Sequence, residues 1–223
     1  MAANGPVRIG LIGDNGSGKS SFLKILAGKE PLEEGGVFWS KDVKIGYLEQ
    51  EVVADTFDVS GGEKKILRLT ELFYSDYGAI LLDEPDNHLD LDYKLWFEQL
   101  VGEYRGVLIV VSHDRKFLEN GVDRIWLLEE KRIKEYPFNY SKFREIYEGE
   151  MTSRRHLWKD QEKERLRLVD VVARLKRYAT ANSKLSGRYQ GAVKRYEKFV
   201  GDMVEKPPED KKVEMRVFLD RQP

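Results

Sequence analysis

The stretch GDNGSGKS, Gly13 to Ser20, constrains the fold more than any other part of the sequence. It matches the pattern G-x-x-x-x-G-K-[ST] directly after the apolar run VRIGLIG and directly before the helical pattern SSFLKILAG. Glycines there let backbone N–H groups curl around a phosphate, and the following helix presents its positive N-terminal end to the same anion. This context disfavours the alternative of a glycine-rich turn without a ligand. We therefore predict a nucleotide-binding loop between a buried strand and a helix.

Apolar runs alternate with helical patterns over the first two-thirds of the chain. Four runs are short, nearly unbroken and rich in aliphatic residues, as strands buried on both faces are: Val7–Gly13, Lys44–Leu48, Ala79–Asp83 and Val107–Ser112. A closing pair, RIWLLEE and KRIKEYP, is typical of a hairpin at the edge of the core. The pattern predicts an α/β fold with a mostly parallel sheet.

Helix formers dominate from about Ser141 onward. Six apolar residues alternate at steps of four and three, which is a heptad seam: Leu185, Tyr189, Ala192, Tyr196, Phe199 and Met203. The preceding segment has a poorer seam, because Gln161 and Arg165 occupy two of its positions. The break at ATANSKLSG would let the two helices fold back as an antiparallel pair.

The predicted organisation is a core at residues 1–140, a helical hairpin at 141–206 and a tail at 207–223. Pro207 and Pro208 should end the second helix, because proline cannot continue one. The sequence contains no cysteine, which excludes disulfides, zinc–thiolate sites and a catalytic thiol. No apolar run approaches the roughly 18 to 20 residues needed to span a bilayer. We therefore expect a cytoplasmic protein without a membrane partner.

The net charge of −1 hides a division along the chain. Residues 1–150 contain 19 Lys/Arg and 28 Asp/Glu, whereas residues 151–200 contain 14 and 5. A basic helical pair suits insertion among RNA phosphates, although a solvated charged face is the plain alternative. The candidate RNA-binding residues around the predicted tip are Arg174, Lys176, Arg177, Lys184, Arg188, Lys194 and Arg195.

Several polar residues follow strands or open helices at positions that suit nucleotide chemistry. Lys19 would reach the β- and γ-phosphates, and the Ser20 hydroxyl would bind Mg²⁺. Asp83 and Glu84 end the strand AILLD, where one carboxylate suits the Mg²⁺ shell and the next would polarise an attacking water. Carboxylates in this position are also commonly helix N-caps, and the phosphate loop upstream favours the metal.

Two further motifs have plain structural readings as well as functional ones. In SGGEKK, Ser60 and Glu63 form a possible capping box, but the two glycines between them also leave N–H groups open to an anion. His113 follows VLIVVS at the edge where open α/β sheets bind ligands. A lone histidine there is more often structural, yet this one could reach a γ-phosphate.

These motifs together resemble the ATPase domain of the ABC superfamily. GDNGSGKS resembles its Walker A, Gln50 its Q-loop glutamine, SGGEK its signature, LLDEP its Walker B, NHLDL its D-loop and His113 its switch histidine. Within the superfamily, DEPDNHLDL, SHDRKFLE and YPFNYSKF resemble the ABC-F subfamily. Asp86 replaces the usual threonine of the first motif, and Phe138 replaces the usual glycine of the third.

The resemblance implies ATP and Mg²⁺ as ligands and assigns a role to each motif residue. ATP would be held by Asp14, Asn15, Gly16, Ser17, Gly18, Lys19, Ser20 and Ser21. Mg²⁺ would be held by Ser20, Gln50 and Asp83, and catalysis would fall to Glu84, His113 and Gln50. Ser60, Gly61, Gly62 and Glu63 would contact the ATP of a partner ATPase domain.

ABC-F proteins bind the ribosome's tRNA exit site and direct their linker toward the P-site tRNA and the peptidyl-transferase centre. The resemblance therefore implies a translation factor or an antibiotic-resistance factor whose partners are rRNA, tRNA and a second ATPase domain. One alternative is the ATPase subunit of a membrane transporter, which would leave the basic helical hairpin unexplained. A regulatory module that only binds ATP is another. A chromosome-maintenance ATPase fits poorly, because its coiled coil interrupts motifs that here all precede the hairpin.

Three departures from the family bear on activity. Residues 1–223 contain one phosphate loop, whereas in the superfamily each ATP lies between Walker A of one domain and the signature of another. We therefore expect this chain alone to bind ATP better than it hydrolyses it. The strands and adenine-stacking aromatic that precede Val7 in the family have no counterpart, and neither does the helical arm between Gln50 and Ser60.

Overall fold

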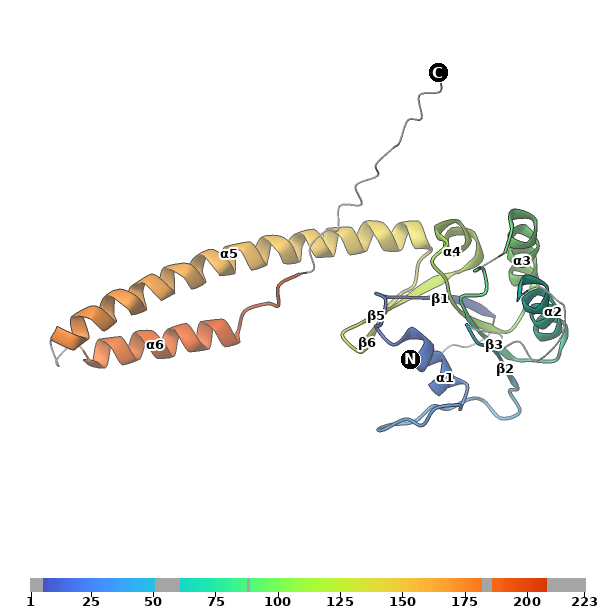
Figure 1. Ribbon diagram of the computed structural model, residues 1–223, viewed down its shortest axis with the longest axis horizontal. Helices are drawn as coiled ribbons and strands as arrows, with labels where there is room; N and C mark the ends of the chain where they lie inside the picture. The colour runs from blue at the N-terminus through green and yellow to red at the C-terminus, as the bar shows by residue number, and fades with distance from the viewer. Residues whose placement is uncertain (1–5, 51–60, 88, 182–185, 208–223) are drawn as a thin grey trace, which may run out of the picture. The chain divides into compact units, whose positions relative to one another are not determined.

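The chain forms two compact units, divided after Glu145. The computed structural model describes residues 6–50, 61–87, 89–181 and 186–207. We call the part up to Glu145 the core unit and the part from Ile146 the hairpin unit (Figure 1). The short join between Gln50 and Ser60 and the tail beyond Pro207 lie outside the described residues.

A six-stranded sheet forms the centre of the core unit, in the order β2-β3-β4-β1-β5-β6. All neighbouring strands run parallel except β5 and β6, which form an antiparallel hairpin. The strands are β1 Val7–Ile12, β2 Ile45–Leu48, β3 Ala79–Asp83, β4 Val107–Val111, β5 Arg124–Glu129 and β6 Arg132–Tyr136. Each lies within one residue of its predicted bounds, so the predicted α/β fold with a mostly parallel sheet is confirmed.

Burial on both faces explains why these runs form inner strands. Every residue of β3 is buried, and so are four of the five residues of β4. Aliphatic side chains can point alternately to both faces only when both faces are covered. The turn between β5 and β6 consists of Glu130 and Lys131 with φ of 51° and 59°, the left-handed pair that a two-residue hairpin requires.

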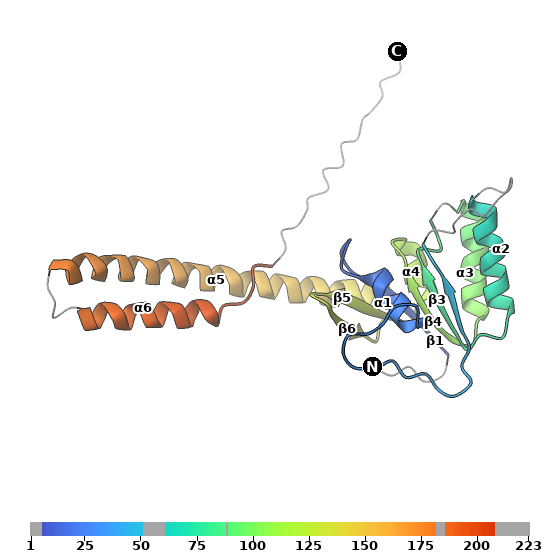
Figure 2. The ribbon, with the colours of Figure 1, turned by 60° about the horizontal axis from the view of Figure 1, so that its bottom comes forward.

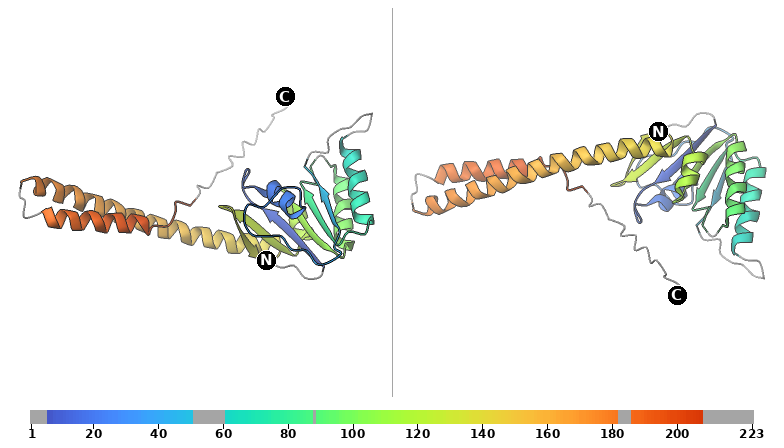
Figure 3. Two further views of the ribbon diagram at one scale, coloured as in Figure 1. Left: turned by 90° about the horizontal axis from the view of Figure 1, so that it is seen from below. Right: turned by 90° about the horizontal axis from the view of Figure 1, so that it is seen from above.

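Helices cover both faces of the sheet. Helix α1 (Lys19–Leu26) lies on one face, whereas α2 (Gly61–Tyr74) and α3 (Leu91–Glu103) lie side by side on the other (Figures 2 and 3). A short helix that the periodicity did not predict, α4 (Arg115–Gly121), follows β4. Asp114 caps it by accepting hydrogen bonds from the backbone N–H groups of Lys116 and Phe117, at 3.0 and 3.3 Å.

The long helix α5 (Tyr140–Ala181) starts on the core unit. Asn139 accepts a hydrogen bond from the N–H of Lys142 at 3.1 Å, and Ser141 donates two bonds of 2.7 Å to Glu119 on α4. The rings of Tyr136 and Phe143 meet edge to face, with centroids 4.9 Å apart. These contacts give the YPFNYSKF element a structural role, because they fix where α5 leaves the sheet.

The hairpin unit pairs the rest of α5 with α6 (Ser186–Gly201), which runs antiparallel beside it (Figure 1). Gln161 and Arg165, the two polar residues in the heptad seam of α5, both make contacts with the chain that returns beside it. Gln161 accepts a hydrogen bond from the N–H of Val204 at 2.9 Å, and Arg165 hydrogen-bonds Tyr196. The predicted helical hairpin is therefore confirmed.

The predicted end of the second helix is wrong. Helix α6 ends at Gly201, six residues before Pro207, and the N–H of Asp202 closes its last turn on the carbonyl of Lys198 at 3.1 Å. The chain after Gly201 then packs along α5 as an extended segment. Its anchors are the Gln161 bond and the Lys206 ammonium, which lies 5.7 Å from the Trp158 ring centroid.

The centre of the sheet should dominate stability. Leu81 on β3 is fully buried in the cluster that includes Leu23 of α1 and Ile109 of β4. Replacing Leu81 with alanine should lower the free energy of unfolding by about 2 to 5 kcal/mol, because it removes packed methyl groups and leaves a cavity. The matched change Leu67→Ala, at a residue 65% exposed on α2, should cost less than about 0.5 kcal/mol in urea unfolding. Equal losses would contradict this account of the core.

One ion pair links the two neighbouring strands β1 and β5. The Nη2 and Nε groups of Arg8 donate to the two carboxylate oxygens of Asp123 at 2.7 and 3.0 Å, and these hydrogen bonds lower the pKa of the Asp123 carboxyl below its ordinary value. The stabilisation is present above the ordinary aspartate pKa, near 3.9, and is lost as pH falls through the lowered one. Asp123→Asn should flatten the stability profile below about pH 4, as followed by thermal melts. An unchanged acid profile would exclude a contribution from this pair.

Candidate functional site

The loop after β1 places Lys19 inside the fold. Gly16 and Gly18 have φ of 81° and 100°, in the left-handed region that glycine adopts without strain. The Lys19 side chain is only 8% exposed, and its ammonium donates to the carbonyls of Gly13 and Asp14 at 2.9 and 3.1 Å. Both acceptors are neutral, so an anionic group such as a phosphate would complete this site electrostatically.

The remaining phosphate-loop residues lie around the start of α1. Asp14, Asn15 and Ser21 are exposed, whereas the Ser17 hydroxyl is buried and has no hydrogen-bond partner within the described part of the chain. The carbonyl of Asp14 accepts a bond from the N–H of Ser17 at 3.1 Å and closes the turn. The loop therefore has both backbone curvature and a polar atom that a ligand could satisfy.

Ser20 and Asp83 come together from α1 and the end of β3. The Ser20 hydroxyl hydrogen-bonds the Asp83 carboxylate. Asp83 is only 1% exposed, and its Oδ1 atom has no hydrogen-bond partner among the described residues. Burial raises the pKa of Asp83, with a further increase from the charge of Glu84, against the lowering effects of Ser20 and Lys19. A hydroxyl beside an unsatisfied buried carboxylate oxygen fits the donor set of a magnesium ion.

Residues 6–50, 61–87, 89–181 and 186–207 contain no group of three or more acidic, histidine or cysteine side chains arranged to hold a metal. A magnesium ion at Ser20 and Asp83 would thus need most of its ligands from phosphate and water oxygens. Such sparse protein ligation is typical of Mg²⁺ bound with a nucleotide. The residues present fit the ion on these terms.

Glu84 is the point where three predicted catalytic side chains meet. The amide of Gln50 donates to its Oε2 atom at 3.1 Å, and Nε2 of His113 lies 3.5 Å from its Oε1 atom. The backbone of Glu84 has φ of 50°, an uncommon value for a residue with a Cβ, and its N–H bonds to the Val111 carbonyl of β4 at 3.0 Å. Non-glycine residues held in this region cluster at functional sites.

The predicted signature residues fall at the start of α2. Gly61, Gly62 and Glu63 form its first turn, whereas Ser60 lies outside the described residues. The predicted RNA-binding residues that can be placed are all exposed, and Lys184 lies outside the described residues. They are Arg174, Lys176 and Arg177 on α5 and Arg188, Lys194 and Arg195 on α6.

Four residues near Glu84 were given no site role by the sequence. Asn87 donates to Glu84 Oε2 at 2.5 Å, and the Lys65 ammonium donates to the Glu84 carbonyl at 2.7 Å. The Ser112 hydroxyl donates a hydrogen bond to Oδ2 of Asp86 at 2.8 Å. A signal for Lys65 exists in the sequence, because it precedes the buried Leu69 and Leu72 by four and seven residues and so shares their helix face.

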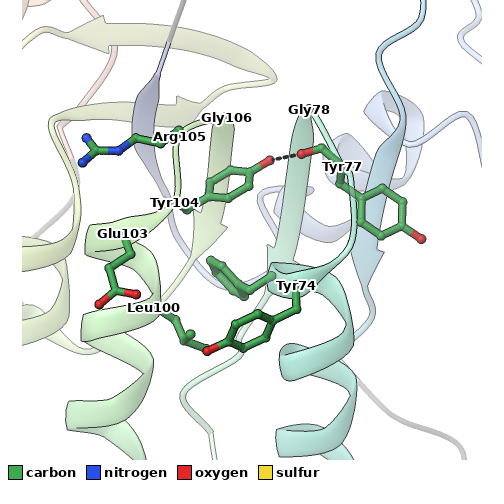
Figure 4. Close-up of a pocket in the computed structure, with 9 residues that line it drawn as sticks. Tyr74, Tyr77, Gly78, Leu100, Glu103, Tyr104, Arg105 and Gly106 are labelled. Atoms are coloured by element: carbon green, nitrogen blue, oxygen red, sulfur yellow. Dashed lines mark hydrogen bonds between the residues drawn. The ribbon is translucent and has the colours of Figure 1, made fainter.

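A separate pocket of about 480 Å³ lies at the opposite end of the parallel strands. It opens between the ends of α2 and α3, beside the glycines that precede β3 and β4 (Figure 4). The Tyr104 hydroxyl donates to the Tyr77 carbonyl at 2.8 Å there, and burial raises its pKa to about 12. The phosphate loop and Glu84 follow the other ends of the strands, so this pocket is not the nucleotide site.

Comparison with known proteins places this arrangement in a family. A family model described as "ABC transporter" matches residues 4–56, and its extension model, with the same description, matches residues 126–217. The first match contains the phosphate loop and Gln50. The second contains β6 and the helical hairpin.

Curated relatives resemble the chain over most of its length but are longer. The "Ribosome protection protein VmlR" of Bacillus subtilis is 33% identical over 177 residues, covering 70% of this chain and 32% of that protein. The "Uncharacterized ABC transporter ATP-binding protein YfmM" of the same organism is 27% identical over 260 residues, covering 80% of this chain and 50% of that protein. That alignment is longer than this chain, so YfmM has internal segments without a counterpart here. The chain thus spans about a third of VmlR and half of YfmM.

Solved structures share the fold. "RNase-L Inhibitor" matches 61% of this chain and 35% of its own length, with 23% identity and a TM-score of 0.54. The structure titled "Dimeric structure of a post-hydrolysis state of the ATP-binding cassette MJ0796 bound to ADP and Pi" matches 62% of this chain and 88% of its own length, with 18% identity and a TM-score of 0.53.

The two family models and the relative VmlR together show the family. The chain belongs to the ABC ATPases, and its ATPase core followed by the linker extension is that of the ABC-F proteins.

Proposed function

We propose that Glu84 is the catalytic base of an ATP-hydrolysing site formed with Gln50 and His113. The carrying observation is that these side chains, from three separate segments, meet at Glu84 beside the Ser20–Asp83 pair. Lys19 and the loop amides would hold the β- and γ-phosphates, and Ser20, Asp83 and Gln50 would hold Mg²⁺. The ion, when bound, neutralises charge that develops on the phosphate oxygens.

The carboxylate of Glu84 would accept a proton from water as that water attacks the γ-phosphorus atom. Gln50 and Asn87 both donate to the Oε2 atom, which leaves Oε1 facing His113. These bonds fix the direction of the carboxylate, and a base gains rate only when it is within hydrogen-bond reach of the proton it takes. His113 would then contact the γ-phosphate.

The proposal extends to the ribosome as the place of action. Exposed cations on both helices of the hairpin unit give it a surface suited to RNA phosphates. VmlR, a relative over 70% of this chain, is named as a ribosome protection protein. We therefore propose a cytoplasmic factor whose hairpin binds rRNA or P-site tRNA, and whose ATPase core works with a second ATPase domain through Gly61, Gly62 and Glu63.

The transporter alternative has less support. No helix in the described part of the chain combines the length and apolar character needed to cross a bilayer. A transporter would also leave the exposed cations of the helical hairpin unexplained, whereas these cations suit a polyanionic partner.

Removing the proposed base should separate binding from turnover. Glu84→Gln should keep Mg·ATP binding but lower hydrolysis at least about 100-fold, because the amide cannot accept the proton. The control Glu98→Gln, on α3, should change neither. Phosphate release should be measured at high protein concentration, because each site would need the signature of a second domain. Wild-type turnover in Glu84→Gln would refute the base, and binding without any turnover in the unaltered chain would favour a binding module.

Neutralising the hairpin should weaken RNA binding and its salt dependence. We expect weaker RNA binding when Arg174, Arg177 and Lys194 are all changed to alanine. The slope of the logarithm of the RNA binding constant against the logarithm of the salt concentration should become shallower by about 0.7 to 0.9 for each RNA phosphate that the hairpin no longer neutralises. The control changes three exposed lysines of the core unit, Lys41, Lys116 and Lys131, to alanine. Filter binding with tRNA or ribosomes at several salt concentrations measures both. Equal effects of the two triple variants would contradict a specific role for the hairpin.

A further inference from the structure

Two oppositely charged side chains are buried beside the catalytic group and have no role in the proposed reaction. Lys65 of α2 is 5% exposed, and Asp86, three residues after the end of β3, is 6% exposed. Burying a charge costs several kcal/mol unless it is paired and hydrogen-bonded. The free-energy cost of burying these two charges must therefore be offset by the contacts that they make.

Lys65 connects α2, the helix that begins with the predicted signature residues and is called the signature helix below, to the segment that carries Glu84. Its ammonium donates to the carbonyl of Glu84 at 2.7 Å and to the carbonyl of Asn87 at 3.2 Å. These two residues flank Asp86 and also contact each other through the Asn87 amide. One side chain of α2 thus closes the turn whose conformation sets the direction of the Glu84 carboxylate.

Asp86 connects the same turn to the segment that carries His113. Its Oδ2 atom accepts a hydrogen bond from the Ser112 hydroxyl at 2.8 Å, and that hydroxyl accepts from the N–H of Asp114 at 2.9 Å. Ser112 and Asp114 are the two neighbours of His113 in the chain. The other carboxylate oxygen, Oδ1, is buried and has no hydrogen-bond partner among the residues the structure describes.

The two charges act on each other. Burial lowers the pKa of Lys65, and the negative charge of Asp86 is the largest influence in the opposite direction, followed by those of Glu84 and Asp83. Asp86 also acts on Lys94 of α3, but that ammonium is bonded to Asp114 at 2.8 Å and is about one-third exposed. Of these two lysines, Lys65 is the buried one, and Asp86 supplies the largest favourable charge effect on it.

We propose that Lys65 and Asp86 are positioning residues that form a buried charged latch between the start of α2, the turn at Glu84 and the turn at His113. The latch would couple the signature helix to the catalytic carboxylate of the same core unit. Its catalytic consequence rests on the proposed ATPase function, whereas the coupling itself is a property of the fold.

A double-mutant cycle tests the electrostatic coupling between Lys65 and Asp86. Lys65→Met and Asp86→Asn keep the approximate shapes and remove one charge each, and each alone should lower the folding equilibrium constant at least about tenfold, because it leaves the other charge uncompensated. The double variant should cost at least about tenfold less than the product of the two. Additivity within about twofold would overturn the coupling between the two charges. If a single variant does not fold, a folded double variant supports the latch and an unfolded one overturns it.

Histidine NMR signals test the transmission without requiring hydrolysis. Lys65 contacts the turn at Glu84 but makes none of the bonds that hold Ser112 and Asp114. Lys65→Met should still shift the ring signal of His113 while leaving that of His156, in the hairpin unit, in place. The matched change Lys64→Met, one residue away and partly exposed, should shift neither. An unmoved His113 signal in Lys65→Met, or equal shifts in both variants, would overturn the coupling.

Steady-state kinetics separate this proposal from the proposed function. The latch predicts that Asp86→Asn lowers kcat for ATP with little change in KM, because Lys19 and the phosphate loop are untouched. Asp86→Glu, which keeps the negative charge and a carboxylate oxygen as an acceptor for Ser112, should recover part of kcat. If the unaltered chain binds ATP without turnover, the double-mutant cycle and the NMR signals still decide whether the latch exists. A change confined to KM would overturn the positioning role.

Discussion

The parallel register of β1, β4 and β3 is the constraint on which the rest of the molecule depends. Leu11 of β1 and Asp83 of β3 both pair with Val111 of β4, so all three strands end at the same edge of the sheet. Parallel pairing leaves every following loop on that edge. The phosphate loop, the Glu84 turn and the His113 turn are neighbours for this reason alone, although up to about a hundred residues separate them in the chain.

Burial then sets the electrostatics at that edge. Lys19, Lys65, Asp83 and Asp86 are all less than one-tenth exposed, and the sheet is closed by helices on both faces. In such surroundings each charged group needs a partner. The two lysines donate hydrogen bonds to backbone carbonyls, and each aspartate accepts one from a serine hydroxyl. Five buried side-chain polar atoms have no hydrogen-bond partner among the described residues, and three of these are Ser17 Oγ, Asp83 Oδ1 and Asp86 Oδ1. The first two belong to the phosphate and metal subsites, and the third belongs to the latch.

The hairpin unit follows a different physical logic. Its two helices share a narrow seam, and polar residues take part in it, as Gln161 and Arg165 show. Most of its surface stays exposed and carries cations, which suits a polyanionic partner better than a further protein layer. Within the core unit, Ser141 and Phe143 anchor only the first residues of α5.

The sequence by itself determined the strands, the phosphate loop and the family, because aliphatic runs, glycine spacing and motif order are local properties. It also predicted Gln50, Glu84 and His113 as a catalytic set, through resemblance. It did not predict α4, whose seven residues give little periodicity, or the early end of α6 at Gly201. Only the tertiary structure decided that Lys65 reaches the Glu84 turn and that Asp86 holds Ser112. Those contacts join segments 19 to 26 residues apart through side-chain donors, and no pattern of neighbouring residues encodes which group each donor reaches.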